Sequence, residues 1–314
     1  MGLFTDLVDP GKFTVQNLPE YIFLCGGELI DKTRSLRANF YDRIQTSNPE
    51  LFNKIQLAEN ADKWYLSRPL EARKIYKDLL ELEEYLAGLS VRILLFVESP
   101  GAIAELGAFA LMPLLREKLI VIIERSHYKK SSFIRNGPIE RLLHLKGDEK
   151  VFPYPWLSGE TIDATTMGDT LEEVIGLVKT AVAKNPKNPK FRRNDHGHLM
   201  LLIADLINLN GILSLTDIQK ILHELKISTP QSVLKKYISL LEQLDLISVE
   251  PYGKLTFYVT RRDAPPYIQY APKVPNKSVE RLTLWPLILK DFAHTGEKKK
   301  AYDAYKRRAE KETS

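Results

Sequence analysis

The stretch VRILLFVESPGAIAELGAF, Val91 to Phe109, decides the fold of the first part of this chain. Its first seven residues are dominated by β-branched and large apolar residues and are bounded by turn formers, which is typical of a buried parallel strand. The Ser-Pro-Gly turn at 99–101 is expected to end the strand, and the Ala- and Leu-rich run from Ala102 to Leu115 predicts a helix. Because ligands of open α/β sheets bind outside the carboxyl ends of the strands, we expect a functional site at this turn.

Two carboxylates flank the turn. Glu98 follows the predicted strand, and Glu105 falls in the first turns of the predicted helix. Paired carboxylates are suited to acid, base or nucleophilic chemistry. A structural alternative is open at this point, in which Glu105 complements the helix dipole and Glu98 is solvated at the strand end.

Length and composition bound the class of protein. A chain of 314 residues exceeds the size at which a single core stops growing, which favours two domains. Hydrophobic residues make up 44% and charged residues 27%, as in ordinary globular proteins, and no apolar run is long enough for a bilayer, so no membrane partner is expected. The single cysteine, Cys25, excludes an intramolecular disulfide, which fits a cytoplasmic protein.

Helix and strand patterns alternate through the first half. Further strands are predicted at Tyr21 to Cys25, Ile55 to Ala58 and Lys118 to Glu124, and helices at Ser35 to Gln45 and Ala72 to Leu86. Such alternation implies a parallel sheet with helices on its faces. The fold class is therefore α/β with a Rossmann-like parallel sheet.

The first predicted strand ends at Cys25, Gly26 and Gly27. The two glycines either admit a phosphate to the head of the next helix or form a tight turn, and the full dinucleotide fingerprint is absent. Cys25 is either a nucleophile or a small buried residue. The six histidines lack the spacing of a zinc motif, so neither a metal nor a cofactor is expected.

The second half predicts a different module. A capping box at Thr170 to Glu173 opens a helix, and the polar segment Asn185 to Asp195 indicates an interdomain linker. Three helices and two strands follow, at Gly197 to Leu209, Leu215 to Leu225, Thr229 to Leu244, Leu246 to Glu250 and Leu255 to Thr260. This order is typical of a winged helix-turn-helix. The expected domains are 1–184 and 196–314, joined by 185–195.

If the second module binds nucleic acid, its third helix and wing carry the contacts. The candidate residues are Gln231, Ser232, Lys235, Lys236, Lys254, Arg261 and Arg262. Winged helices also bind proteins, so a solvated basic face is the alternative. The basic tail at 296–314 is expected to form a helical or frayed surface segment.

Four segments together carry a resemblance: IFLCGG at Ile22 to Gly27, FVESPGAIAELGAF at Phe96 to Phe109, REKLIVI at Arg116 to Ile122 and SSFIRNGPIERLL at Ser131 to Leu143. In this order they resemble the effector proteins encoded beside retron reverse transcriptases, whose first domain is similar to nucleoside deoxyribosyltransferases. The resemblance implies a nucleotide substrate, and as partners a retron reverse transcriptase with its msDNA and msrRNA. It is also compatible with a higher-order assembly.

The resemblance assigns roles to residues near the turn. The glutamate of the family's ELG motif attacks the anomeric carbon of the sugar, and it corresponds to Glu105. Apart from the resemblance, the chemistry of N-glycosidic cleavage calls for a second acid that helps the base leave, and Glu98, Glu59 and Glu83 are the alternatives for it. The expected substrate-binding residues are Gly26, Gly27, Ser99, Gly101, Glu59 and Asn136.

Two departures from the transferase pattern affect the predicted activity. Ser99 replaces an aspartate six residues before the nucleophile, and the first strand ends in Phe23, Leu24 and Cys25 without the usual tyrosine. We therefore expect a hydrolase that breaks the N-glycosidic bond of a nucleotide or related cofactor, acting as a retron toxin in antiviral defence. The alternative is a nucleotide-sensing DNA-binding regulator without catalysis.

Overall fold

The computed structural model describes residues 2–30, 32–33, 35–60, 75–145, 149–155, 167–261, 263–275, 279–291, 293 and 296–311. For residues 309–311 it describes the backbone alone. The chain forms two compact units. The sheet unit contains the described residues of Pro19–Arg68 and Asp78–Asn185. The helical unit contains the described residues of Met1–Leu18, Pro69–Lys77 and Pro186–Ser314. The first 18 residues therefore group with the C-terminal part, whereas the sequence placed them in the first domain.

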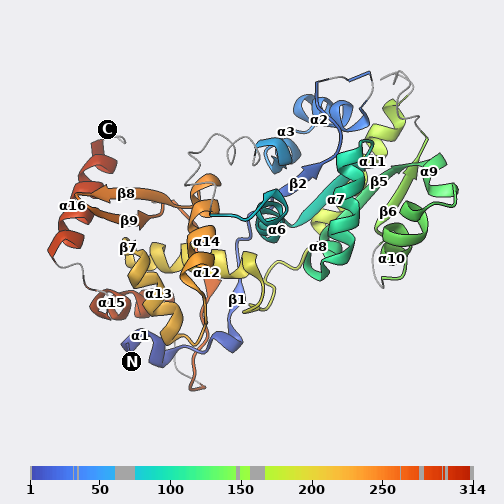
Figure 1. The fold of residues 1–314 in the computed structure, drawn as a ribbon. Coiled ribbons are helices and arrows are strands. Elements are labelled where there is room, and N and C mark those ends of the chain that lie inside the picture. Colours follow the sequence, from blue (N-terminus) through green and yellow to red (C-terminus); the bar gives the residue numbers. More distant parts are fainter. Residues whose placement is uncertain are drawn as a thin grey trace. The chain divides into compact units, whose positions relative to one another are not determined.

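A five-stranded parallel sheet forms the centre of the sheet unit (Figure 1). The strands lie in the order β3-β2-β4-β5-β6, and their bounds are β2 Ile22–Cys25, β3 Ile55–Leu57, β4 Arg92–Val97, β5 Leu119–Glu124 and β6 Val151–Tyr154. Four of them lie where the sequence predicts them. The fifth, β6, was not predicted because its short run contains Pro153, which a strand at the edge of a sheet tolerates.

Helices cover both faces of this sheet. On one face, Phe40 and Ile44 of α2 and Val174 of α11 share a core with Leu94 and Phe96 of β4. On the other face, α7 packs on β4 and β5, and α8 on β4 (Figure 1). The helix bounds in this unit are α2 Leu36–Ser47, α3 Pro49–Phe52, α6 Leu79–Leu89, α7 Pro100–Leu111, α8 Pro113–Lys118, α9 Arg125–Lys129, the π-helical turn η2 Arg135–Ile139, α10 Glu140–Leu143 and α11 Gly168–Ala183. The unit is the predicted Rossmann-like α/β fold.

Three predicted helix boundaries were wrong. α7 starts at Pro100 and ends at Leu111, because the proline at position 113 begins α8. α6 starts at Leu79, where the Asp78 side chain accepts from the backbone N–H of Glu81; residues 72–74 of the predicted helix lie outside the described residues. α11 starts at Gly168, so the expected capping box at Thr170 lies inside the helix.

The helical unit has the element order expected of a winged helix-turn-helix. Its elements are α12 His196–Asn210, β7 Leu213–Ser214, α13 Leu215–Glu224, α14 Gln231–Gln243, β8 Ser248–Tyr252 and β9 Leu255–Val259, and the antiparallel sheet has the order β7-β9-β8. The two-residue strand β7 is too short to show a periodic pattern. A capping box between Ser214 and Asp217 begins α13 directly after it.

The N-terminal residues complete this unit. Strand β1, Thr14–Val15, pairs with β10, Ile268–Gln269, and Phe13 packs between Tyr270 and Phe191. Phe191 is buried, and its N–H donates to the carbonyl of Phe13 at 2.9 Å. The segment 185–195 is therefore not wholly a linker, since its second half belongs to the packed core of the helical unit.

Four remaining helical elements belong to the same unit: α1 Leu3–Leu7, the single turn η1 Pro10–Lys12, α15 Arg281–Asp291 and α16 Gly296–Lys311. Ala301 of α16 is buried against Ile212 and Phe257, and the hydroxyl of Tyr305 donates to the carbonyl of Thr260 at 2.9 Å. Of the two alternatives for the basic tail, its described residues 296–311 thus form the helix, which packs on the unit. Among the described residues, no helix combines the length and apolarity that crossing a membrane requires.

Candidate functional site

The predicted site lies where the strand order of the parallel sheet reverses. The chain moves from β2 to β3 in one direction and then from β4 to β5 and β6 in the other. Gly26 and Gly27 follow β2, and Glu98 and Ser99 follow β4, so both turns lie at the carboxyl ends of neighbouring strands. Such a switch point is the usual ligand crevice of an open α/β sheet.

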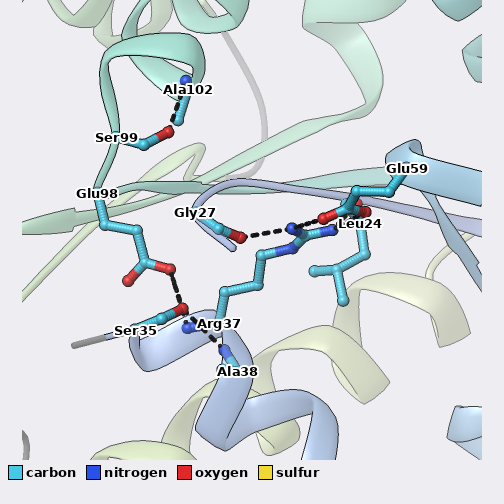
Figure 2. Close-up of polar contacts among 9 residues, drawn as sticks. All are labelled: Leu24, Gly27, Ser35, Arg37, Ala38, Glu59, Glu98, Ser99 and Ala102. Atoms are coloured by element: carbon cyan, nitrogen blue, oxygen red, sulfur yellow. Dashed lines mark hydrogen bonds and ion pairs between the residues drawn. The ribbon is translucent and has the colours of Figure 1, made fainter. Parts of the chain in front are cut away.

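Ser99 and Pro100 start helix α7 at this point. The Ser99 hydroxyl accepts from the N–H of Ala102 at 3.1 Å, and Pro100 takes the first helical position (Figure 2). Gly101 is exposed in the first turn. Because the helix begins at 100, Glu105 lies in its second turn, past the turn where a carboxylate gains most from the dipole. The dipole explanation of Glu105 is weakened accordingly.

Glu98 holds the start of α2. Its Oε1 accepts from the Ser35 hydroxyl at 2.6 Å (Figure 2) and from the N–H of Arg37 at 3.2 Å. Its Oε2 accepts from the N–H of Leu36 at 2.8 Å. Burial raises the pKa of Glu98, and these hydrogen bonds act in the opposite direction. The carboxylate therefore joins the end of β4 to the N-terminus of α2, which is a supporting role.

Arg37 is a buried cation that the sequence reading missed. Its guanidinium donates to the carbonyl of Leu24 at 2.9 Å and to that of Gly27 at 2.6 Å, and it forms a two-pronged ion pair with Glu59 (Figure 2). The first turn of a helix disfavours a cation, so an arginine there already indicates an anionic partner. Glu59 is thereby fixed beside the end of β2.

The charged groups around Cys25 show which side chains gather at the end of β2. Burial raises the pKa of the Cys25 thiol well above its usual value, which favours the interpretation of Cys25 as a small buried residue over that of a nucleophile. The carboxylates of Glu105 and Glu83 raise this pKa further, Arg37 lowers it, and Glu59 raises it. Carboxylates from α6, α7 and the segment after β3 thus all contribute to the pKa of one thiol.

Glu105 and Glu83 differ in their surroundings. Glu105 is half-buried on α7, and its Oε2 is shielded from solvent. Glu83 is almost fully buried on α6. The sequence named Glu83 only as one of three alternatives for the second acid, because sequence separation does not give distances across a crevice.

The glycine pair forms a tight turn that the protein fills with its own side chains. Gly26 has φ +144°, and a Cβ there would lie 2.8 Å from the carbonyl oxygen of Phe96 and 2.9 Å from Cδ of Arg37. A Cβ on Gly27 would lie 3.0 Å from Cγ of Glu98. These contacts support the tight-turn interpretation of the two glycines.

Asn136 lies on η2, away from Glu105. Its amide donates to the Ser131 hydroxyl at 3.1 Å, and it lines a hollow of about 570 Å³ together with Gly107 and Ala110 of α7. At 3.6 residues per turn, both α7 positions point roughly opposite to Glu105. Glu98 and Ser99 instead line a smaller hollow of about 140 Å³ at the ends of β4 and β5.

The candidate nucleic-acid residues of the helical unit are only partly accessible. Gln231, Ser232 and Lys235 are exposed at the start of α14, and Lys254 is exposed in the β8–β9 turn. Lys236 is buried and its carbonyl accepts from the Tyr76 hydroxyl at 2.8 Å, so its expected contact with a groove was wrong.

The structure describes one of the two arginines that follow the β8–β9 hairpin, Arg261, and not the other, Arg262. Arg261 is exposed but forms ion pairs with Asp263 at 3.2 Å and Asp245 at 3.5 Å, which reduce the charge that it offers to a phosphate. Arg262 lies outside the described residues.

Two proteins of Escherichia coli are similar to this chain. One, named "Retron Ec73 putative ribosyltransferase/DNA-binding protein", is 27% identical over 191 residues, which are 59% of this chain and 58% of that protein. The other, "Retron Ec86 putative ribosyltransferase/DNA-binding protein", is 34% identical over 143 residues, 45% of this chain and 43% of that protein. The chain thus spans about half the length of these relatives.

The match to a protein family is longer. Residues 33–249 match the family described as STM3845 retron effector protein. This range includes Arg37, the turn at Glu98, Glu105, η2, and the helical unit as far as β8. Because the match covers more than half of its length, the chain belongs to the STM3845 retron effector family.

Proposed function

We propose that this chain is the effector of a retron defence system and that its sheet unit hydrolyses the N-glycosidic bond of a nucleotide or related cofactor. One observation carries the proposal: Glu105 lies half-buried in the second turn of α7, the helix that begins at the switch point of the parallel sheet, and its carboxylate contributes to the raised pKa of Cys25 at the end of β2. A carboxylate at the switch point of a nucleotide-binding type of sheet suits attack on a sugar.

Glu105 acts as the nucleophile in this proposal. Departure of the base breaks the bond between the base nitrogen and the anomeric carbon, and the developing oxocarbenium ion is trapped by a Glu105 carboxylate oxygen. Water then attacks the anomeric carbon, passes its proton to the group that protonated the departing base, releases the Glu105 carboxylate and leaves a hydroxyl on the sugar.

Glu83 is our candidate for the acid that protonates the leaving base nitrogen. Glu83 is almost fully buried, and burial disfavours the charged form of a carboxyl group. Like Glu105, it contributes to the raised pKa of the Cys25 thiol. Glu98 and Glu59 are positioning residues, since their carboxylates hold α2 and Arg37 respectively.

The helical unit tethers the effector to its retron partners, which we propose are the reverse transcriptase and its msDNA. The names of both relatives include DNA binding. The exposed polar surface suited to DNA binding consists of Gln231, Ser232, Lys235 and Lys254. Phosphate contacts of such residues would position the effector without reading sequence.

The test of the activity is the nearly isosteric change Glu105→Gln. Chromatography of nucleotides and free bases after induced expression together with the retron partners should show base release by the wild type and at least a hundredfold less by the variant, since a nucleophile is lost. Glu117→Gln, which changes an exposed carboxylate on α8, is the matched control and should release base normally.

Undiminished base release by the Glu105→Gln protein would reject Glu105 as nucleophile. If the wild type with its partners releases no base from any nucleotide, the proposal of catalysis fails. The nucleotide-sensing regulator would then be the better description.

A further inference from the structure

The hollow of about 570 Å³ in the sheet unit is open to solvent and is bounded on one side by helix α7. Gly107 and Ala110 of α7 form the floor, and Phe133, Gly137, Pro138 and Arg141 are among the residues that surround it. A Cβ placed on Gly107 meets nothing within 4 Å. A glycine inside a helix costs about 1 kcal/mol relative to alanine, and here it leaves room for a group to approach the helix backbone.

An exposed aromatic ring stands at the edge of this hollow. Phe133 is 87% exposed, and its ring lies 3.6 Å from the position of a Cβ on Gly137. Leu111, on the α7 side of the hollow, is 63% exposed. Two large apolar side chains facing solvent around one hollow differ from the scattered single ones that are normal on a surface.

The chain segment from α9 to α10, which supplies most residues of the hollow, is basic, and Arg141 lies in the lining itself. Arg125, Lys129, Lys130 and Arg141 are exposed, and none of them forms an ion pair with another described residue. Arg135 is different, since it pairs with Glu140 and lies over the ring of Tyr128 at 5.1 Å, which joins α9 to η2. The positive charge of α9 and α10 is therefore available to a ligand.

We propose that this hollow, with Phe133 and the basic residues beside it, binds single-stranded nucleic acid. One base stacks on the Phe133 ring above the Gly107–Ala110 floor, and Arg141, Lys129 and Lys130 contact the neighbouring phosphates. An exposed aromatic ring inside a positively charged groove is the usual platform for single strands without sequence preference.

The site is separate from the proposed glycosidase centre. It lies on the side of α7 turned away from Glu105, and binding there breaks no bond. The inference therefore goes beyond the proposed function and stands without it. A second copy of this chain is a poorer occupant, because the chain carries a net charge of +5 and the surface is itself basic.

The test uses the full-length Glu105→Gln protein, so that no cleavage can consume the probe. An oligothymidylate of about ten nucleotides, within the site size of single-strand binders, carries 5-iodouracil for photo-crosslinking. We expect the crosslinked peptide to contain Phe133. The crosslink yield at that peptide should fall about tenfold in Phe133→Ala, which removes the stacking ring.

Gly107→Leu fills the hollow without a clash and should reduce the same yield about tenfold. Gly176→Leu is its matched control, because Gly176 lies on α11 with equally open space and is far from the hollow in the sequence. The control should crosslink like the parent protein. Lys129→Glu should weaken binding at low salt and make the remaining binding less dependent on salt, since one phosphate contact is lost.

Three results would overturn the proposal. The first is a crosslink found only in the helical unit, and the second is equal loss of yield in Gly107→Leu and Gly176→Leu. The third is a dimer in mass photometry that Phe133→Ala converts to a monomer while oligonucleotide crosslinking is unchanged, which would assign the surface to self-association.

Discussion

Arg37 shows how a single residue fixes the geometry of the site. Its side chain is 1% exposed, and it binds two backbone carbonyls and the Glu59 carboxylate. A buried guanidinium is tolerated only when its donors are matched by acceptors. Arg37 therefore holds the turn after β2, and Glu59 with it, in one arrangement.

Replacement of Arg37 by methionine should lower the free energy of unfolding by about 3 kcal/mol, since two carbonyls and one carboxylate lose a donor. Urea unfolding checks this value. Arg43→Met on the same helix is the matched control, because its ion pair with Glu172 is half-exposed and is worth at most about 0.5 kcal/mol. Equal losses in the two variants would contradict the role given to Arg37.

At the scale of elements, the site depends on how two helices begin. The N-terminus of α7 is capped by the hydroxyl of Ser99, the residue that directly precedes the helix. The N-terminus of α2 is capped both by the hydroxyl of Ser35, which precedes it, and by the carboxylate of Glu98 from the end of β4. The carboxylate lies at the helix N-terminus, where the N–H groups lack partners and the dipole favours negative charge. Glu98 thus sets the position of α2, and of Arg37 on it, relative to the sheet.

The raised pKa of Glu98 gives a pH dependence of stability. Because the folded chain holds this proton more tightly than the unfolded chain, ionisation costs stability as the pH rises from the usual 4.5 through the folded pKa. The difference in unfolding free energy between wild type and Glu98→Gln should therefore decrease over that range and then level off. Urea titrations at several pH values measure it, and a difference that increases with pH would refute it.

At the scale of the whole molecule, residues from both chain ends build one unit. Phe4 packs edge-on against Tyr270, and the N–H of Phe4 donates to Asp291 at 2.9 Å. Asp205 on α12 is fully buried and accepts from the N–H of Tyr267 at 2.7 Å and from Arg281 at 2.9 Å. The helical unit therefore requires the N-terminus as well as residues beyond the three-stranded sheet.

Phe13→Ala should destabilise the helical unit by about 3–5 kcal/mol, because it empties a fully buried site. Hydrogen exchange should show the loss of protection in α12 and β10 and unchanged protection in β4 and β5. Phe133→Ala, which removes an exposed ring, is the control and should change stability by less than about 0.5 kcal/mol. Loss of protection confined to the parallel sheet would contradict the division into units.

The sequence by itself determined four of the five parallel strands, the existence of the main helices between them and the helix order of the second unit, because apolar periodicity and turn residues are local signals. It also pointed to the turn at 98–101, to Glu105 and to the retron effector family. Only the tertiary structure decided that Glu98 holds α2, that Arg37 binds Glu59, that Lys236 is buried and that residues 1–18 belong to the second unit. Each of these features depends on contacts between segments that are distant in the chain. Such contacts produce no periodic pattern in the sequence from which they could be predicted.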